Sequence, residues 1–187
     1  MRPEALKPRP ECPEPGRWVA PDEWASETDV SVFLGNLVRL LKPDLVLETG
    51  TYTGHTACEM GVALRELGRG RLVSIELDRH RVKEATTRVS GLPVDVLMGS
   101  SLSYTPTGPI DLLFIDSEFP IRMDEVRRFQ AWASPRCVVV AHDSAVPTNY
   151  PGVPAFLEAM QAVVAEGVVL PWLLLPTPRG LALTRYR

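Results

Sequence analysis

Short apolar runs alternate with segments of helical periodicity along most of this chain, which has 187 residues. The runs are too short for helices and are bounded mostly by charged, Gly or Pro residues, which is typical of buried strands. They cover residues 45–48, 72–76, 94–98, 111–116 and 137–141. This alternation predicts an α/β fold in which a parallel sheet has helices on both faces.

The segments around these strands have apolar side chains three and four positions apart, as amphipathic helices do. We expect helices at residues 29–41, 57–67, 78–89, 123–133 and 153–165. Pro43 ends the first helix, and Asp78 is placed to cap the third. Residues 99–109 are rich in Ser, Thr, Pro and Gly, so at most a remnant of a helix is expected there.

Two further apolar runs end the chain, at residues 168–175 and 180–186. The link between them is so short that they must be antiparallel, because a parallel return needs a crossover of about a dozen residues. The predicted fold is therefore a Rossmann-like, doubly wound, mostly parallel seven-stranded sheet with a C-terminal antiparallel hairpin.

Prolines interrupt the beginning of the chain so often that no regular element is expected there. We predict that residues 1–28 form a proline-rich N-terminal arm and that residues 29–187 form a single domain. Trp18 and Trp24 favour docking of the arm on the domain, because exposed indoles are costly in water.

The charge and composition of the chain exclude some classes of partner. A net charge of −3 and a pI near 5.7 provide no basic field for nucleic acid. The sequence has neither a membrane-spanning apolar run nor an apolar signal segment. Cys12, Cys58 and Cys137 show no disulfide-type spacing, so we expect a cytoplasmic protein without a membrane partner. Whether it forms a homo-oligomer stays open.

In open parallel sheets, ligands bind beyond the carboxyl ends of the strands. The residues found there are Glu48 with Gly50 and Gly54, then Glu76, Ser100 and Asp116, and finally His142, Asp143 and Ser144. The two glycines allow a tight turn that a ligand can approach closely, or they only pack a helix against a strand. Glu76 suits the hydroxyl groups of a ribose, with a solvated carboxylate or a partner of Arg81 as the alternative.

Five segments together resemble the class I S-adenosylmethionine-dependent methyltransferases. They are residues 45–57 (LVLETGTYTGHTA), 74–78 (SIELD), 98–101 (MGSS), 113–116 (LFID) and 139–143 (VVAHD). Within this class, the chain is most similar to the small-molecule O-methyltransferases of the catechol O-methyltransferase type. The terminal hairpin separates this class from nicotinamide-binding Rossmann domains.

The resemblance implies S-adenosylmethionine as cofactor and a set of residues that bind it. The set consists of Glu48, Gly50, Thr51, Tyr52, Gly54, His55, Thr56, Glu76, Ser100 and Asp116. In the family, the first strand end and the glycine loop hold the methionine part, Glu76 corresponds to the ribose ligand, and Asp116 lies near the transferred methyl. Acidic residues suit the positive sulfonium and ammonium groups of this cofactor.

The resemblance also implies a divalent cation such as Mg²⁺, with Asp116 and Asp143 as ligands and Ser144 as a weaker third. The lysine that the family uses after its fourth strand is missing, and Arg122 does not readily lose a proton. Asp116, His142 and Asp143 are therefore the candidate catalytic residues. His142 is either a general base or a structural hydrogen-bonding residue.

From these residues we expect an enzyme that methylates a hydroxyl of a small hydroxylated or catechol-like acceptor. Trp18, Trp24, Phe119 and Tyr150 are candidates for the wall around an aromatic acceptor, or for the core. One alternative is a nicotinamide-dependent oxidoreductase, against which the missing third glycine and the hairpin argue. A cofactor-binding module without catalysis is the other, suggested by the missing lysine.

Overall fold

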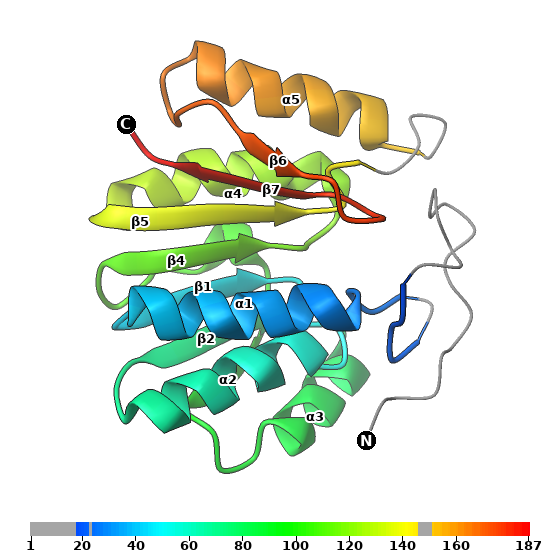
Figure 1. Cartoon of the computed structure of the whole chain (residues 1–187), viewed down its shortest axis with the longest axis vertical. Helices are drawn as coiled ribbons and strands as arrows, with labels where there is room; N and C mark the ends of the chain where they lie inside the picture. Colours follow the sequence, from blue (N-terminus) through cyan, green and yellow to red (C-terminus); the bar gives the residue numbers. More distant parts are fainter. Residues whose placement is uncertain (1–17, 23, 146–150) are drawn as a thin grey trace.

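Seven strands form one sheet in the order β3-β2-β1-β4-β5-β7-β6 in a computed structural model that describes residues 18–22, 24–145 and 151–187 (Figure 1). The strands are β1 (Leu45–Thr49), β2 (Arg71–Glu76), β3 (Val94–Met98), β4 (Ile110–Ile115), β5 (Ala133–His142), β6 (Leu173–Leu175) and β7 (Leu181–Arg185). The first five are parallel, whereas β7 is antiparallel to both β5 and β6. The predicted Rossmann-like sheet with a C-terminal hairpin is thus confirmed.

Helices cover both faces of the sheet. They are α1 (Thr28–Leu41), α2 (His55–Leu67), α3 (Arg79–Arg88), α4 (Arg122–Phe129) and α5 (Val153–Ala165), with short 3-10 turns η1 (Ser101–Ser103), η2 (Phe119–Ile121) and η3 (Gln130–Trp132). Side chains alternate between the two faces of a strand and so divide the core: Val46 belongs to the cluster of α1 and α2, while Leu45 and Leu47 belong to the cluster of α4 and α5. In Figure 1, α1, α2 and α3 lie in front of the sheet and α4 lies behind it.

The strand order reverses between β1 and β4. From β1 the chain first adds β2 and β3 on one side, and then returns to add β4 and β5 on the other. The loops that leave β1 and β4 consequently diverge, which opens a crevice at their carboxyl ends. The fold therefore places its ligand site beside Gly50 and Asp116, the residues that follow these two strands.

Two predicted boundaries were wrong. The helix expected at residues 123–133 ends at Phe129, and the strand expected at 137–141 begins at Ala133. Ser134 and Arg136 both donate to Asp111 Oδ1, at 2.8 and 3.1 Å, which draws this segment alongside β4. Pro135 also holds the residue before it in an extended conformation.

The hairpin strand expected at residues 168–175 is also shorter than predicted. Only Leu173–Leu175 pairs continuously with β7, and Val169 forms a single bridge with Tyr186. Pro171 lies between them and has no N–H to donate to a neighbouring strand. Within residues 99–109 only η1 is helical, and Asp78 caps α3 through the N–H groups of His80 and Arg81, both as predicted.

The described part of the N-terminal segment lies at the carboxyl edge of the sheet, where the strand arrows of Figure 1 point. Trp18 and Ala20 are buried there, with 7% and 1% of their surface exposed. The docking expected of this segment is therefore present from Trp18 onward, while residues 1–17 lie outside the described residues. Among the described helices, none is long and apolar enough to cross a membrane.

Candidate active site

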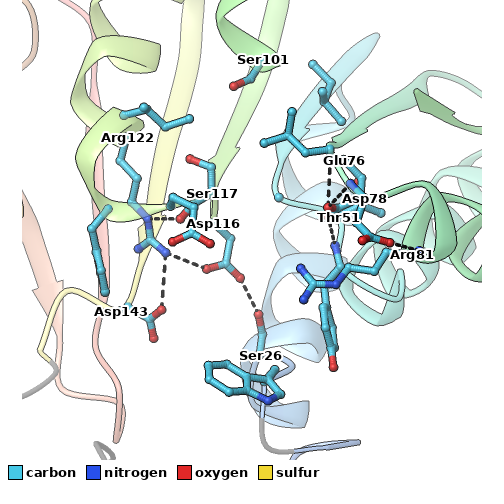
Figure 2. A pocket seen from close by; sticks show the side chains of 18 of the residues that line it. Ser26, Thr51, Glu76, Asp78, Arg81, Ser101, Asp116, Ser117, Arg122 and Asp143 are labelled. Atoms are coloured by element: carbon cyan, nitrogen blue, oxygen red, sulfur yellow. Dashed lines mark hydrogen bonds and ion pairs between the residues drawn. The ribbon is translucent and has the colours of Figure 1, made fainter. Parts of the chain in front are cut away.

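A cavity of about 740 Å³ opens at the carboxyl ends of the parallel strands. Its two sides come from different strands (Figure 2). Thr51, Glu76 and Asp78, from the ends of β1 and β2, lie on one side, and Asp116 and Arg122 lie on the other. The predicted cofactor residues on the cavity wall are Gly50, Thr51, Tyr52, His55, Thr56, Glu76, Ser100 and Asp116.

Gly50 makes the turn out of β1 possible. Its φ is 84°, and a Cβ on it would lie 2.2 Å from the backbone oxygen of Asp116. Such a contact is forbidden. Only glycine therefore allows the backbone after β1 to pass so close to the backbone after β4. Gly54 does not line the cavity; a Cβ there would meet Ala85 of α3 at 2.9 Å, so this glycine allows the beginning of α2 to pack closely against another helix and not against a strand.

Glu76 is held as a rigid acceptor at the end of β2. Its Oε2 accepts from the Tyr52 N–H at 2.8 Å, and its Oε1 accepts from the N–H groups of Leu77 and Asp78, both at 3.0 Å. Backbone donors of this kind stabilise a carboxylate and fix its orientation. Of the roughly four acceptor positions of a carboxylate, these three donors leave Glu76 about one, which can accept a hydrogen bond from a hydroxyl group in the cavity.

Glu48 lies behind the glycine loop and not on the cavity wall. It is buried, with 1% exposed, and its Oε2 accepts from Ser74 Oγ at 2.5 Å. Burial raises the pKa of Glu48 to about 8, against the lowering effect of the Ser74 hydrogen bond and with smaller contributions from Asp116 and Glu76. Its contact with the cofactor stays a prediction.

Asp116 begins the second side of the site, directly after β4. Its Oδ2 accepts from Ser26 Oγ at 2.8 Å, and its Oδ1 faces His142 Nδ1 at 3.2 Å and Arg122 Nη2 at 3.3 Å. A carboxylate has about four acceptor positions. Three donors thus leave Asp116 able to accept one more hydrogen bond, and the residue lines the cavity.

Asp143 follows β5 with a φ of 57° and is nearly fully buried. Its Oδ2 lies 3.4 Å from Arg122 Nη2, and its Oδ1 lies 2.7 Å from Arg179 Nε. The two arginines lie on α4 and on the loop between β6 and β7. The predicted acid pair is therefore brought together, but with two guanidinium groups against it.

His142 is fully buried and does not line the cavity. Its Nε2 lies 2.6 Å from Glu27 Oε2, and its Nδ1 faces Asp116. Burial opposes protonation, but Asp143, Asp116 and Glu27 outweigh it and raise the pKa of His142 to about 10. An imidazole that is charged at neutral pH and faces carboxylates through both nitrogens is poorly placed to take a proton from a substrate.

The residues predicted to hold a divalent cation already face positive groups. Asp116, His142 and Asp143 offer atoms that lie within 4.8 Å of one another, and carboxylate oxygens are suitable ligands for Mg²⁺. These carboxylates, however, already face Arg122 and Arg179. Ser144, the predicted third ligand, is buried and does not line the cavity.

Aromatic side chains lie at the mouth of the cavity. Trp24 and Phe119 line it, and Trp24 is 50% exposed. Trp18 does not line the cavity and instead packs against Arg179, whose Cζ lies 5.8 Å from the centroid of the indole ring. Of the four predicted wall residues, two therefore line the cavity, one packs beneath it, and Tyr150 lies outside the described residues.

Sequence reasoning missed Glu27, Glu125 and Arg179, and it considered Arg122 only as a base. Glu125 is fully buried on α4 and accepts from Thr49, Ser101 and Ser117. Part of this was detectable, because Arg122 and Glu125 share the helix face of Val126 and Phe129 at spacings of three and four. Glu27 and Arg179 have no such local pattern.

Solved structures with this fold align over most of the chain. The O-methyltransferase TomG from Streptomyces achromogenes, involved in tomaymycin synthesis and solved with S-adenosylmethionine, has a TM-score of 0.75 and 22% identity, covering 88% of this chain and 82% of its own. The methyltransferase PaMTH1 from Podospora anserina, bound to S-adenosylhomocysteine, has a TM-score of 0.78 and 16% identity, covering 88% and 81%. An O-methyltransferase from Bacillus cereus, also with S-adenosylhomocysteine, has a TM-score of 0.75 and 18% identity, covering 88% and 83%. These similarities define the class of fold.

The sequence also matches a family directly. The profile of a methyltransferase-domain family matches residues 47–144, from β1 to just beyond β5. The match covers about half of the chain and includes both sides of the cavity, so this chain belongs to that methyltransferase family. The resemblance to methyltransferases is thereby confirmed. A comparison with curated protein sequences gave no significant match.

Proposed function

We propose that this chain transfers the methyl group of S-adenosylmethionine to a hydroxyl oxygen of a small acceptor. The observation that carries the proposal is the pair formed by Glu76 and Asp116. Both carboxylates line one cavity from its two sides (Figure 2), at the carboxyl edge of the sheet of a methyltransferase-family domain.

The side formed by β1 and β2 suits the cofactor. Glu76 offers a fixed carboxylate to ribose hydroxyls, and acidic groups favour a cofactor that has a sulfonium and an ammonium. His55 and Thr56 place the beginning of α2 on the cavity wall, where free N–H groups attract a carboxylate. When bound, S-adenosylmethionine supplies an electrophilic methyl group.

The other side suits the acceptor. Phe119, which packs against Arg122 on this side, provides apolar surface for a flat ring, and Trp24 adds to the apolar lining of the cavity. The remaining acceptor position of Asp116 can receive the hydrogen bond of a substrate hydroxyl, orient its oxygen and take up its proton as the methyl group is transferred. Alignment of the reacting atoms supplies most of the rate in this proposal, as expected when no strong base is present.

Binding of the cofactor is tested by calorimetry with S-adenosylmethionine and S-adenosylhomocysteine. Glu76→Gln puts an amide donor against backbone donors, which costs about 1–3 kcal/mol, so the Kd should rise roughly ten- to hundred-fold. The matched control is Glu158→Gln, an exposed position on α5. A folded wild-type protein that binds neither compound would overturn the proposal.

Methyl transfer is tested by following S-adenosylhomocysteine formation with a panel of phenols, catechols and aliphatic alcohols. We expect turnover with a subset of these acceptors, and Asp116→Asn should lower kcat more than it raises the Kd for the cofactor. Cofactor binding without turnover on the whole panel would instead favour a non-catalytic module.

A further inference from the structure

The acid pair at the ends of β4 and β5 is the strongest cluster of charge in the site. Its four oxygen atoms all have a donor or a positive group within reach: Asp116 Oδ2 accepts from Ser26, and Asp116 Oδ1 and Asp143 Oδ2 share Arg122 Nη2. Asp143 Oδ1 faces Arg179 Nε at 2.7 Å. The positions that a cation would occupy between the acids are therefore taken by guanidinium groups.

Arg122 is fixed in place by groups other than the acids. Its Nε donates to Ser117 O and its Nη1 to His142 O, both at 2.6 Å. Its Cζ lies 4.4 Å from the centroid of the Phe119 ring, and its side chain is only 4% exposed. A cation that displaced this guanidinium would leave two backbone carbonyls without their donors.

Arg179 is equally constrained. Its Nη1 donates to Ala25 O at 2.8 Å, and its backbone N–H donates to Glu27 Oε1 at 3.1 Å. Its side chain is 2% exposed. Arg179 therefore cannot swing away from Asp143 without breaking the contacts that hold the N-terminal segment.

The balance of charge leads to the same conclusion. The described carboxylates in contact here are Glu27, Asp116 and Asp143; two permanent positive charges already lie against the two aspartates, and the His142 ring occupies the space between Glu27 and Asp116. A divalent ion would add two more positive charges in direct contact with buried guanidinium groups. Repulsion at such distances is strong in a poorly solvated site.

We propose that Arg122 and Arg179 take the place of a divalent cation in this protein, and that they position Asp116 and Asp143 without any metal. The step from positioning to metal-independent methyl transfer rests on the proposed function, but the absence of metal binding does not. The arginines are positioning residues, since the role proposed for each is to hold a carboxylate, Asp116 and Asp143 for Arg122 and Asp143 for Arg179.

The test titrates Mn²⁺ alone into the full chain and follows free Mn²⁺ by electron paramagnetic resonance, with no cofactor or acceptor present. We expect no saturable site in the wild type at millimolar Mn²⁺. Arg122→Met removes the shared guanidinium and should create a site, which a second change, Asp143→Asn, should abolish. Glu158→Gln is the surface control, and circular dichroism checks the fold of each variant.

Saturable Mn²⁺ binding by the wild type that disappears in Asp143→Asn would overturn the proposal. So would a folded Arg122→Met protein that gains no affinity for Mn²⁺. If Arg122→Met does not fold, Arg179→Met replaces it with the same expected gain. Methyltransferase activity, once found, should be unchanged by a chelator, and a loss that Mg²⁺ restores would also contradict the proposal.

Discussion

Glu27 and His142 form a buried contact of 2.6 Å across 115 positions of the chain. Glu27 lies just before α1, and His142 is the last residue of β5. The other Glu27 oxygen accepts from the backbone N–H of Arg179, at 3.1 Å. One carboxylate therefore joins the N-terminal segment, the central sheet and the C-terminal hairpin. The His142 ring that it contacts also faces Asp116, which lines the cavity.

Glu27→Ala should destabilise the whole domain and not only the N-terminal segment. It leaves His142 and the Arg179 N–H without their buried partner, and breaking a buried ion pair costs about 3–5 kcal/mol. Urea denaturation measures the free energy of unfolding, with Glu158→Ala as an exposed control. A change below about 1 kcal/mol, the range typical of surface pairs, would contradict the assigned role.

The pairing of His142 also predicts how stability depends on pH. Its pKa is raised from 6.5 to about 10 in the folded protein, so the folded state holds the proton more tightly than the unfolded state. This contribution is fully present below about pH 6.5 and is lost as the pH rises through about 10. In thermal melts between these pH values, the Tm should fall as the pH rises, and this decrease should be smaller in His142→Asn than in the wild type. An equal slope in both proteins would contradict the expectation.

Glu48 should make the folded protein less stable as the pH rises, whereas an acid whose pKa is lowered by folding makes it more stable. Its pKa is raised from 4.5 to about 8, so folding takes up a proton between these values and stability falls as the pH rises. Glu48→Gln keeps an acceptor for Ser74 and removes the titration. Its stability relative to wild type should therefore grow by up to about 1.4 kcal/mol per pH unit in this window. Denaturation at pH 5 and pH 8 measures the difference, and a gap that does not widen would contradict it.

The elements of this fold were predictable because their signals are local. Apolar runs marked β1 to β5, and the strand-end rule identified Glu76, Asp116 and Asp143 as residues of one edge. The network around the acids was not predictable in the same way. Glu27 and Arg179 lie far apart in the chain, and only the folded sheet shows that their charges are buried together.

Boundaries failed where a side chain or a proline overrode the pattern. The apolar spacing continued beyond Phe129, but hydrogen bonds to Asp111 extended β5 backward to Ala133. Pro171 had a comparable effect on the hairpin by removing a donor. The surroundings of His142 were not predictable either: its position at the end of β5 was expected, but only the fold shows that its ring is buried between Glu27 and Asp116.

Gly50 and Gly68 form a matched pair for testing the turn after β1. Both have positive φ, at 84° and 64°, but a Cβ at Gly68 would meet nothing within 4 Å. Gly68→Ala should cost only the conformational term of about 1–2 kcal/mol. Gly50→Ala adds a clash with the Asp116 carbonyl and should cost at least about 2 kcal/mol more. Chemical denaturation of the two variants measures both, and equal losses would show that the close approach of β1 and β4 is not required.

Trp24→Ala tests whether the N-terminal segment contributes to the acceptor site. The indole lines the cavity and is half exposed, so its removal should affect stability little. Loss of its stacking surface should raise the KM for an aromatic acceptor roughly ten-fold, equivalent to about 1.4 kcal/mol. The Kd for S-adenosylmethionine should stay within about three-fold, since the cofactor contacts proposed above are those of Glu76 and the beginning of α2 and do not include the indole. Leu40→Ala, on the exposed face of α1, controls for the loss of surface apolar area. An unchanged acceptor KM, or an equal loss for cofactor and acceptor, would place the acceptor elsewhere in the cavity.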